Sequence, residues 1–308
     1  MSPRRTKNAE KSRGFGGEWT DSKLRVLQAY LAAYTKALRD KPTKEHPFRK
    51  AYIDAFAGTG SRDARDDAAD GRAQELLFPD LAEKAPQELL DGSARLALKT
   101  EPRFDRYVFI ERNAKRCAEL ATLKTEFPKL ASSISIRNRE ANVEIQDMCS
   151  KDWRSRRAVL FLDPYGMQVE WKTLKAVAGT KAIDMWLLFP FGIGINRLLT
   201  KSGDIPTSWR KRLDLLLGNT DWYEEFYKVE TTPTLFGDEQ ELVKTKMRGI
   251  ARSFNRRLQS VFAGVVEEPG VLRNSRGSPL YLLWFAAGNA HGKDVAIRIA
   301  THLLKGLH

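Results

Sequence analysis

Short apolar runs alternate with amphipathic stretches along most of this chain, which is typical of strands that alternate with helices. The predicted strands span Ala51–Phe56, Tyr107–Ile110, Ile134–Arg137, Val159–Leu162 and Ile183–Phe189. The predicted helices are one capped by Thr20 with apolar positions from Leu24 to Leu38, then Ser93–Leu98, Asn113–Phe127, Asn142–Cys149 and Trp171–Val177. Because the strands are apolar almost throughout, we expect a mostly parallel α/β sheet with helices on both faces.

The last third of the chain follows a different pattern. Residues 195–262 have no strand signal, and we interpret them as a helical insertion before the last two strands. Its predicted helices are Ile195–Thr200, Ser208–Leu217, Trp222–Tyr227 and a long one from about Glu239 to Val261. The predicted closing elements are the strands Gly264–Val271 and Leu280–Ala287 and the helix Lys293–Leu304.

Two segments do not fit the alternating pattern. Residues 1–16 are basic and lack apolar periodicity, which indicates a flexible tail that is either a solvated terminus or a nucleic-acid arm. Residues 61–91 are charged and broken by Pro79 and Pro86, so we expect an insertion outside the sheet. The remaining pattern predicts a single domain over residues 17–308.

Composition narrows the class of protein. The 308 residues are 42% hydrophobic, enough for a sizeable core, and the formal net charge of +13 favours polyanionic partners such as nucleic acid. Two cysteines and four scattered histidines argue against a disulfide scaffold and against a metal centre. Neither a membrane span nor an apolar signal sequence is visible, so we expect a cytoplasmic protein.

The first candidate site segment is Asp54-Ala-Phe56-Ala-Gly58-Thr-Gly60, at the end of the first predicted strand. Glycines there let a ligand approach the backbone at the edge where parallel sheets bind ligands, although a plain strand-to-turn junction has the same pattern. A nicotinamide-dinucleotide fingerprint is disfavoured, because Asp63 stands where the third glycine would be needed.

Polar residues follow the next two strands. Glu111 stands where a nucleotide-like ribose would present its hydroxyls, or it is a surface or capping acid of the next helix. Glu140 and Asn142 follow the third strand, where a side chain could bind an adenine edge; Asn142 could instead be a helix N-cap.

The fourth segment, Asp163-Pro164-Tyr165-Gly166, is the most informative. A buried aspartate needs a partner, and Asp163 together with the Pro164 carbonyl could accept both hydrogens of an exocyclic amine. Tyr165 could stack on the base that carries the amine. The alternative is a simple strand-end turn, which Asp-Pro often forms.

The order of these four segments resembles class I S-adenosylmethionine (SAM)-dependent methyltransferases, which have a Rossmann-like fold. That resemblance implies that SAM is the cofactor and that Asp163, Pro164 and Tyr165 face the methyl acceptor. It also implies cofactor contacts from Asp54, Phe56, Gly58, Gly60, Glu111, Glu140 and Asn142.

A more specific resemblance is to the three-Cys-motif partner proteins (TcmP), a bacterial family. It is carried by Trp19-Thr, Lys23-Leu, Tyr52 to Gly60, Phe109-Ile-Glu111, Ala141-Asn142 and Leu160 to Gly166. The resemblance implies a three-Cys-motif protein as a possible partner. The Asp-Pro-Tyr-Gly segment, however, looks more like the tRNA guanine-N2 dimethyltransferases than the adenine amino-methyltransferases.

The predicted function is therefore methylation of an exocyclic amine of a nucleobase in DNA or RNA. Two alternatives stay open: a non-catalytic SAM- or nucleotide-binding subunit of a partner protein, and a methyltransferase for proteins or small molecules. A basic stripe of Lys244, Arg248, Arg252 and Arg256 on the predicted long helix is either a phosphate-contacting face or a solvated one.

Overall fold

The computed structural model describes residues 18–40, 43, 48–57, 92–164, 166–235 and 237–307. The predicted tail (1–16) and the predicted insertion (61–91) lie outside these ranges, as do Gly58, Gly60 and Tyr165.

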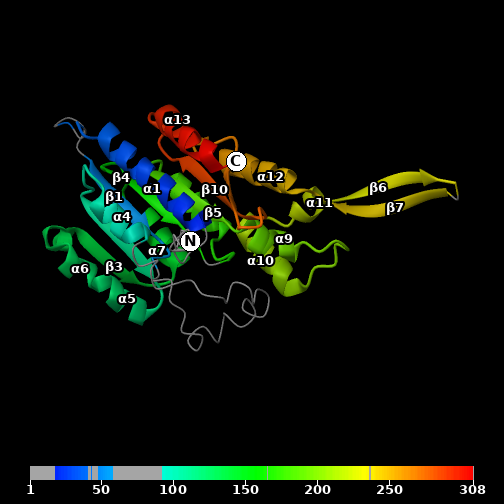
Figure 1. Cartoon of the computed structure of the whole chain (residues 1–308), viewed down its shortest axis with the longest axis horizontal. Coiled ribbons are helices and arrows are strands. Elements are labelled where there is room, and N and C mark those ends of the chain that lie inside the picture. The colour runs from blue at the N-terminus through cyan, green and yellow to red at the C-terminus, as the bar shows by residue number, and fades with distance from the viewer. Residues whose placement is uncertain are drawn as a thin grey trace, which may run out of the picture.

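A central sheet with the strand order β3-β2-β1-β4-β5-β10-β8 organises the molecule, and β9 pairs with β10 (Figure 1). Its strands are β1 (Arg49–Asp54), β2 (Arg106–Glu111), β3 (Ile134–Asn138), β4 (Arg156–Leu162), β5 (Ile183–Phe189), β8 (Gly264–Val265), β9 (Gly270–Arg273) and β10 (Pro279–Ala287). The strands β1 to β5 are parallel, whereas β10 runs antiparallel to β5, β8 and β9. The α/β fold with a mostly parallel sheet is thus confirmed.

Helices cover both faces of this sheet. On one face α1 packs against α4 and α13, and on the other α8 packs against α7 and α10. The helices are α1 (Glu18–Ala37), α4 (Ser93–Lys99), α5 (Ala114–Ala121), α6 (Leu123–Glu126), α7 (Ala141–Cys149), α8 (Trp171–Gly179), α9 (Asn196–Leu198), α10 (Thr207–Leu217), α11 (Trp222–Phe226), α12 (Met247–Gln259) and α13 (Lys293–Leu304). Short helical turns are η2 (Pro128–Ser133), η3 (Phe191–Ile195) and η4 (Lys305–Leu307).

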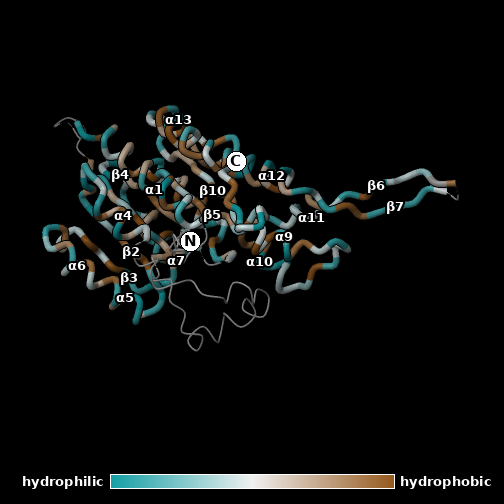
Figure 2. Tube along the Cα trace, viewed as in Figure 1, coloured by the Kyte–Doolittle hydropathy of each residue, from teal (hydrophilic) through white to brown (hydrophobic). Residues whose placement is uncertain are grey.

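Burial explains why the apolar runs become strands. Every residue of β5 is buried, as are the last five residues of β4, because helices shield both sides of the sheet. Figure 2 shows the hydrophobic colouring concentrated in the central strands.

The prediction of an all-helical insertion at 195–262 is wrong, because this segment contains the hairpin β6 (Tyr227–Thr234) and β7 (Gly237–Lys244). The predicted helix from Glu239 begins only at Met247. Both strands are largely exposed. They therefore lack the alternation of apolar and polar residues by which a half-buried strand is recognised in a sequence. Figure 1 shows the hairpin extending beyond the rest of the described chain.

Two smaller predictions are also corrected. The predicted strand Gly264–Val271 is divided into β8 and β9, and Pro269, which has no amide hydrogen to donate, stands between them. The predicted helix Asn113–Phe127 is divided at Thr122 into α5 and α6.

Candidate functional site

The strand order reverses direction at β1, because the chain leaves β1 for β2 on one side and returns to β4 on the other. In open parallel sheets, ligands bind beyond the carboxyl ends of the strands at such a switch point. The register aligns these ends, because Asp54 of β1 lies opposite Phe109 of β2 and Phe161 of β4. Glu111 and Asp163 each follow these partners by two residues, so both stand at the same edge of the sheet, one on each side of β1.

The backbone after β1 crosses this switch point. The amide of Ala55 donates to the carbonyl of Phe161 at 3.1 Å, and the amide of Ala57 donates to the carbonyl of Ile110 at 3.1 Å. The turn that begins at Asp54 is therefore tied to both neighbouring strands. Phe56 is half-buried within this turn, and Gly58 and Gly60 lie just beyond the described residues.

Asp54 is fully buried at the end of β1. Burial raises the pKa of its carboxyl from 3.8 to about 6, and the negative charge of Asp163 adds to this shift, while the Ser93 and Tyr52 hydroxyls partly offset it. The Tyr52 hydroxyl donates to Oδ2 of Asp54 at 3.2 Å. Among the described residues, Oδ1 of Asp54 has no hydrogen bond of acceptable geometry, so this site retains an unused buried acceptor.

Asp163 is paired with a cation that the sequence analysis did not assign to the site. The ammonium of Lys23, on α1, donates to Oδ2 of Asp163 and is itself buried, while Asp163 retains 25% side-chain exposure. The same ammonium lies 5.0 Å from the centre of the Trp19 ring, which in turn packs at 4.9 Å against Tyr281 of β10. Pro164 is buried beside this group, and Tyr165 lies outside the described residues.

Lys23 could not be recognised as a site residue from its position in the sequence. Lys23 and Asp163 are 140 residues apart, and only the packing of α1 brings them together. The one available signal was that Trp19-Thr and Lys23-Leu belong to the stretches that resemble the TcmP family.

Glu111 lies at the edge of the sheet and stabilises the turn that follows β2. Its Oε1 accepts the amide of Asn113 at 2.7 Å, and Asn113 rather than Glu111 is the N-cap of α5. This hydrogen bond holds the Glu111 side chain against the turn that follows β2.

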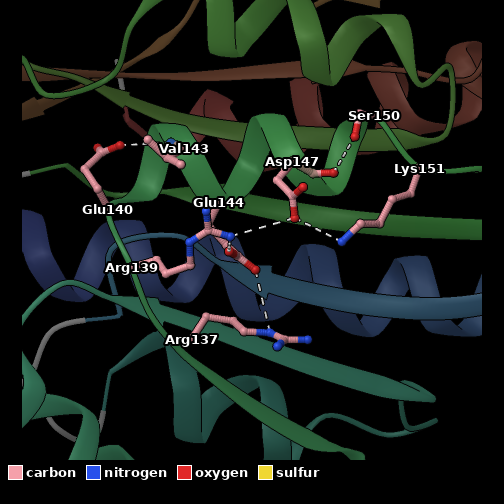
Figure 3. Close-up of polar contacts among 8 residues, drawn as sticks. All are labelled: Arg137, Arg139, Glu140, Val143, Glu144, Asp147, Ser150 and Lys151. Atoms are coloured by element: carbon pink, nitrogen blue, oxygen red, sulfur yellow. Dashed lines mark hydrogen bonds and ion pairs between the residues drawn. The ribbon is translucent and has the colours of Figure 1, made fainter.

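The side chains of Glu140 and Asn142 both form hydrogen bonds within the protein. Glu140, and not Asn142, is the N-cap of α7, because its Oε2 accepts the amide of Val143 at 2.9 Å (Figure 3). The Asn142 amide donates to the Gln168 carbonyl at 2.9 Å, and its oxygen accepts from the Glu170 amide at 3.0 Å and the Thr173 hydroxyl at 2.8 Å. Asn142 thus anchors the segment between Asp163 and α8 to α7.

An ion-pair network surrounds the start of α7. Figure 3 shows Arg137 and Arg139 directed at Glu144, which is buried, and Arg139 also approaches Asp147. Arg139 donates to Glu144 at 2.8 Å. These two consecutive residues therefore have separate structural roles: Arg139 pairs with Glu144 of α7, and Glu140 caps the first turn of that helix.

The basic stripe is shorter than the sequence predicts. Lys244 belongs to β7 and not to a helix, and its ammonium donates to the carbonyls of Asn196 and Leu199 at 3.2 and 2.9 Å. Burial lowers the pKa of Lys244, which is consistent with a structural role. Arg248, Arg252 and Arg256 do share an exposed face of α12.

The described ranges contain neither a group of three or more potential metal-ligating side chains nor a helix with the length and apolar character needed to cross a bilayer. At the edge of the sheet stand the three carboxylates of Asp54, Glu111 and Asp163, with one cation, Lys23, paired to Asp163, and together they make an acidic site in a protein of net charge +13. Such a site is suited to a ligand that carries positive charge and hydroxyl groups.

Comparison with known proteins gives only distant structural likenesses. No family model and no curated protein matches this sequence. Among solved structures, protein LPL1258 of Legionella pneumophila is similar over 95% of this chain and 93% of its own, at 11% identity and a TM-score of 0.45. The putative methyltransferase yhhF of Escherichia coli is similar over 71% of this chain and 85% of its own, at 10% identity and a TM-score of 0.28. A putative rRNA methylase of Clostridium thermocellum is similar over 70% of this chain and 97% of its own, at 13% identity and a TM-score of 0.28. Since all three TM-scores are below 0.5, the fold assignment depends on the observed sheet order and not on these likenesses.

Proposed function

We propose that this protein is a SAM-dependent methyltransferase that methylates an exocyclic amine of a nucleobase in DNA or RNA. The observation that carries the proposal is the set of three carboxylates, Asp54, Glu111 and Asp163, on adjacent strand ends at the switch point of the sheet. SAM carries a sulfonium, an ammonium and two ribose hydroxyls, and all of these are partners that carboxylates prefer.

The residues present fit this cofactor. The unpaired, buried Oδ1 of Asp54 is an acceptor that lacks a donor in the described part of the protein, and Glu111 is already oriented by the Asn113 amide. We assign Asp54 and Glu111 to the cofactor, together with Phe56, Gly58 and Gly60 of the adjoining turn. When bound, SAM supplies a methyl group that is already strongly electrophilic.

The residues of this chain then have to position the acceptor. Asp163 accepts a hydrogen bond from the acceptor amine. Its negative charge stabilises the positive charge that develops on the amine nitrogen. Pro164 has no amide hydrogen to compete for Asp163, and its carbonyl is available for the second amine hydrogen. Holding the reacting atoms in line supplies up to about 7–11 kcal/mol in favourable cases. Tyr165 is proposed to stack on the base. Asn142 contributes indirectly, by holding the segment after Asp163 against α7.

One observation favours a second candidate function, a non-catalytic SAM- or nucleotide-binding subunit that acts with a partner such as a three-Cys-motif protein. The carboxylate that would receive the acceptor amine is already paired with Lys23. A permanently neutralised Asp163 would leave ligand binding intact but would prevent methyl transfer.

Transfer of a labelled methyl group from SAM separates these candidates. We expect label in RNA or DNA with the wild type and none with Asp163→Asn, while both proteins bind S-adenosylhomocysteine equally in calorimetry. Binding without transfer to any polymer supports the subunit function, and label only in protein or in a small metabolite supports the other class of acceptor. Failure to bind S-adenosylhomocysteine overturns the proposal.

Replacement of Lys23 tests whether the acceptor amine must displace it. The Lys23 ammonium is buried, but solvent reaches the Asp163 carboxylate and screens the pair, so we take its contribution as about 1 kcal/mol, which corresponds to about fivefold in affinity. We expect Lys23→Met to lower the KM for the acceptor by about this factor and to leave S-adenosylhomocysteine affinity unchanged. Reduced affinity for S-adenosylhomocysteine would instead identify Lys23 as a cofactor contact.

A further inference from the structure

A basic groove lies on the face of the molecule formed by α8, α11 and α12. It is an open depression of about 440 Å³, lined by three cations, Lys175, Arg256 and Arg257, together with Trp171 and the single carboxylate of Glu225. The groove lies near the methyl-acceptor end of the sheet, because α8 begins at Trp171, directly after the segment that carries Asp163. Phe254 of α12 also packs on Phe189, the last residue of β5, with ring centres 4.2 Å apart.

Arg257 is held in this groove over an aromatic ring. Its guanidinium lies 5.1 Å from the centre of the Trp171 ring, and among the described residues its buried Nε has no hydrogen-bond partner. Burial lowers the pKa of Arg257, whereas the charges of Glu225 and Asp221 act in the opposite direction. A buried Nε–H that lacks an acceptor is costly to the folded protein unless a ligand supplies one.

The floor of the groove is rigid. The Trp171 ring lies against Gly218, where φ is +73° and a Cβ atom would come within 2.1 Å of the ring. The ring also packs edge-on against Phe254. Arg257 is therefore presented on a fixed surface, so that little conformational entropy is lost when a ligand binds.

Positive charge continues from the groove along α12. Arg252 and Arg248 precede Arg256 by one and two helical turns on the same exposed face, at steps of about 6 Å. Glu225 is only a partial counter-ion, because its Oε2 is engaged by the Ser253 hydroxyl and lies 4.0 Å from Arg256.

We propose that this groove binds the phosphodiester backbone of a nucleic acid, with Arg257 on one phosphate through its planar fork and with Lys175 and Arg256 on its neighbours. The inference deepens the proposed function, because it identifies where the acceptor polymer is held beside the methyl-transfer site. Arginine forks match the paired oxygens of a phosphate, and the ring beneath keeps the fork in place. The exposed arginines of α12 extend the contact along the strand.

The test is binding of a fluorescein-labelled single-stranded RNA, and of the DNA of the same sequence, over a range of salt concentrations and in the absence of SAM. Removing one phosphate-binding cation reduces the slope of log K against log salt by about 0.7 for a single strand. We expect the double variant Lys175→Gln/Arg256→Gln to reduce this slope by about 1.4. The matched control is Lys124→Gln/Lys129→Gln, which removes the same charge at the opposite edge of the sheet, beside β3, and should retain the slope. Equal reductions in both double variants would mean that only net charge matters and would overturn the proposal.

Two single variants sharpen the result. Glu225→Gln should tighten RNA binding, because it removes the one carboxylate from the groove. Arg257→Lys keeps the charge but not the fork, so it should weaken binding without changing the slope. No effect of either variant would overturn the proposed contacts.

Inorganic phosphate serves as the control ligand. Calorimetric binding of phosphate to the wild type as tight as that of the RNA would identify a small-anion site and overturn the assignment to a polymer. RNA binding is measured without SAM, so it does not depend on methyl transfer. If the groove binds RNA but the protein transfers no methyl group, only the proposed function is refuted. Transfer to nucleic acid that is unaffected by the groove variants would refute only the present inference.

Discussion

At the residue scale, two carboxylates are buried at opposite ends of the parallel strands, and they serve different purposes. Asp54 stands at the carboxyl end of β1 with an unused oxygen among the described contacts. Asp184 stands near the start of β5, where both of its oxygens accept hydrogen bonds, from the Tyr30 hydroxyl at 2.9 Å and the Gly288 amide at 3.1 Å. Burial raises the pKa of each carboxyl from 3.8 to about 6.

These shifts predict how stability depends on pH. Because the folded-state pKa is the higher one, each carboxyl contributes most to stability below pH 4, and this contribution is lost as the pH rises through about 6. The loss amounts to roughly 3 kcal/mol at most for each group. We therefore expect Asp54→Asn and Asp184→Asn to unfold at higher urea concentration than the wild type at pH 8, with little difference at pH 4.

The two variants are matched controls for each other. Only Asp54→Asn should weaken S-adenosylhomocysteine binding, since Asp184 lies away from the switch point. A stability difference that is the same at both pH values would contradict the assigned titrations.

Individual residues also show how far the sequence by itself could locate side chains. Asp54 and Glu111 end β1 and β2 and Asp163 follows β4, so an acid at the end of an apolar run could be noted from the sequence, and the register places all three at one edge. The structural roles of Asn142 and Lys244 could not be predicted, because their partners, Gln168 and Asn196, lie 26 and 48 residues away.

At the element scale, strands buried on both faces were predictable, and exposed strands were not. The runs that became β1 to β5 are apolar because helices cover them. Outside its base, where Tyr227 and Leu242 are packed, the β6–β7 hairpin has no buried face and is rich in acidic and threonine residues, so its sequence resembles a polar helix as closely as a strand.

The exposure of this hairpin predicts that its outer part contributes little to folding. A two-stranded ribbon without a packed face is only marginally stable by itself. We expect a variant in which Asn-Gly replaces Thr231–Gln240, joining the paired residues Glu230 and Glu241, to keep its melting temperature within about 2 °C.

The base of the hairpin provides the contrast. Leu242 packs against the core, so Leu242→Ala should cost about 1–2 kcal/mol in chemical denaturation. A large drop in stability on shortening the hairpin would mean that its outer part does contact the body of the protein.

At the scale of the whole molecule, a sheet of order 3-2-1-4-5 gathers residues from distant parts of the chain at one edge. Residues of α1, β1, β2, the segment after β4, and β10 meet there. The chain passes from Asp163 of the acidic site to α8 of the basic groove within a few residues, an arrangement that suits a cationic cofactor and a polyanionic acceptor.

Because ligand binding to the folded state raises overall stability, the cofactor assignment has a global readout. S-adenosylhomocysteine at about 100 times its Kd should add about 2.7 kcal/mol and raise the melting temperature by roughly 5 °C. NAD at the same concentration should have no effect, and the shift should disappear in Asp54→Asn. An equal shift with NAD would contradict the assignment.

By itself, the sequence determined the alternation of strands and helices and the mostly parallel sheet, because burial on both faces leaves a local apolar pattern. The tertiary structure alone decided that Lys23 pairs with Asp163, that Asn142 is consumed by internal hydrogen bonds, and that Arg257 lies on Trp171 in a basic groove. These contacts join residues far apart in the chain, and the packing of helices and strands that creates them leaves no periodic signal in the sequence.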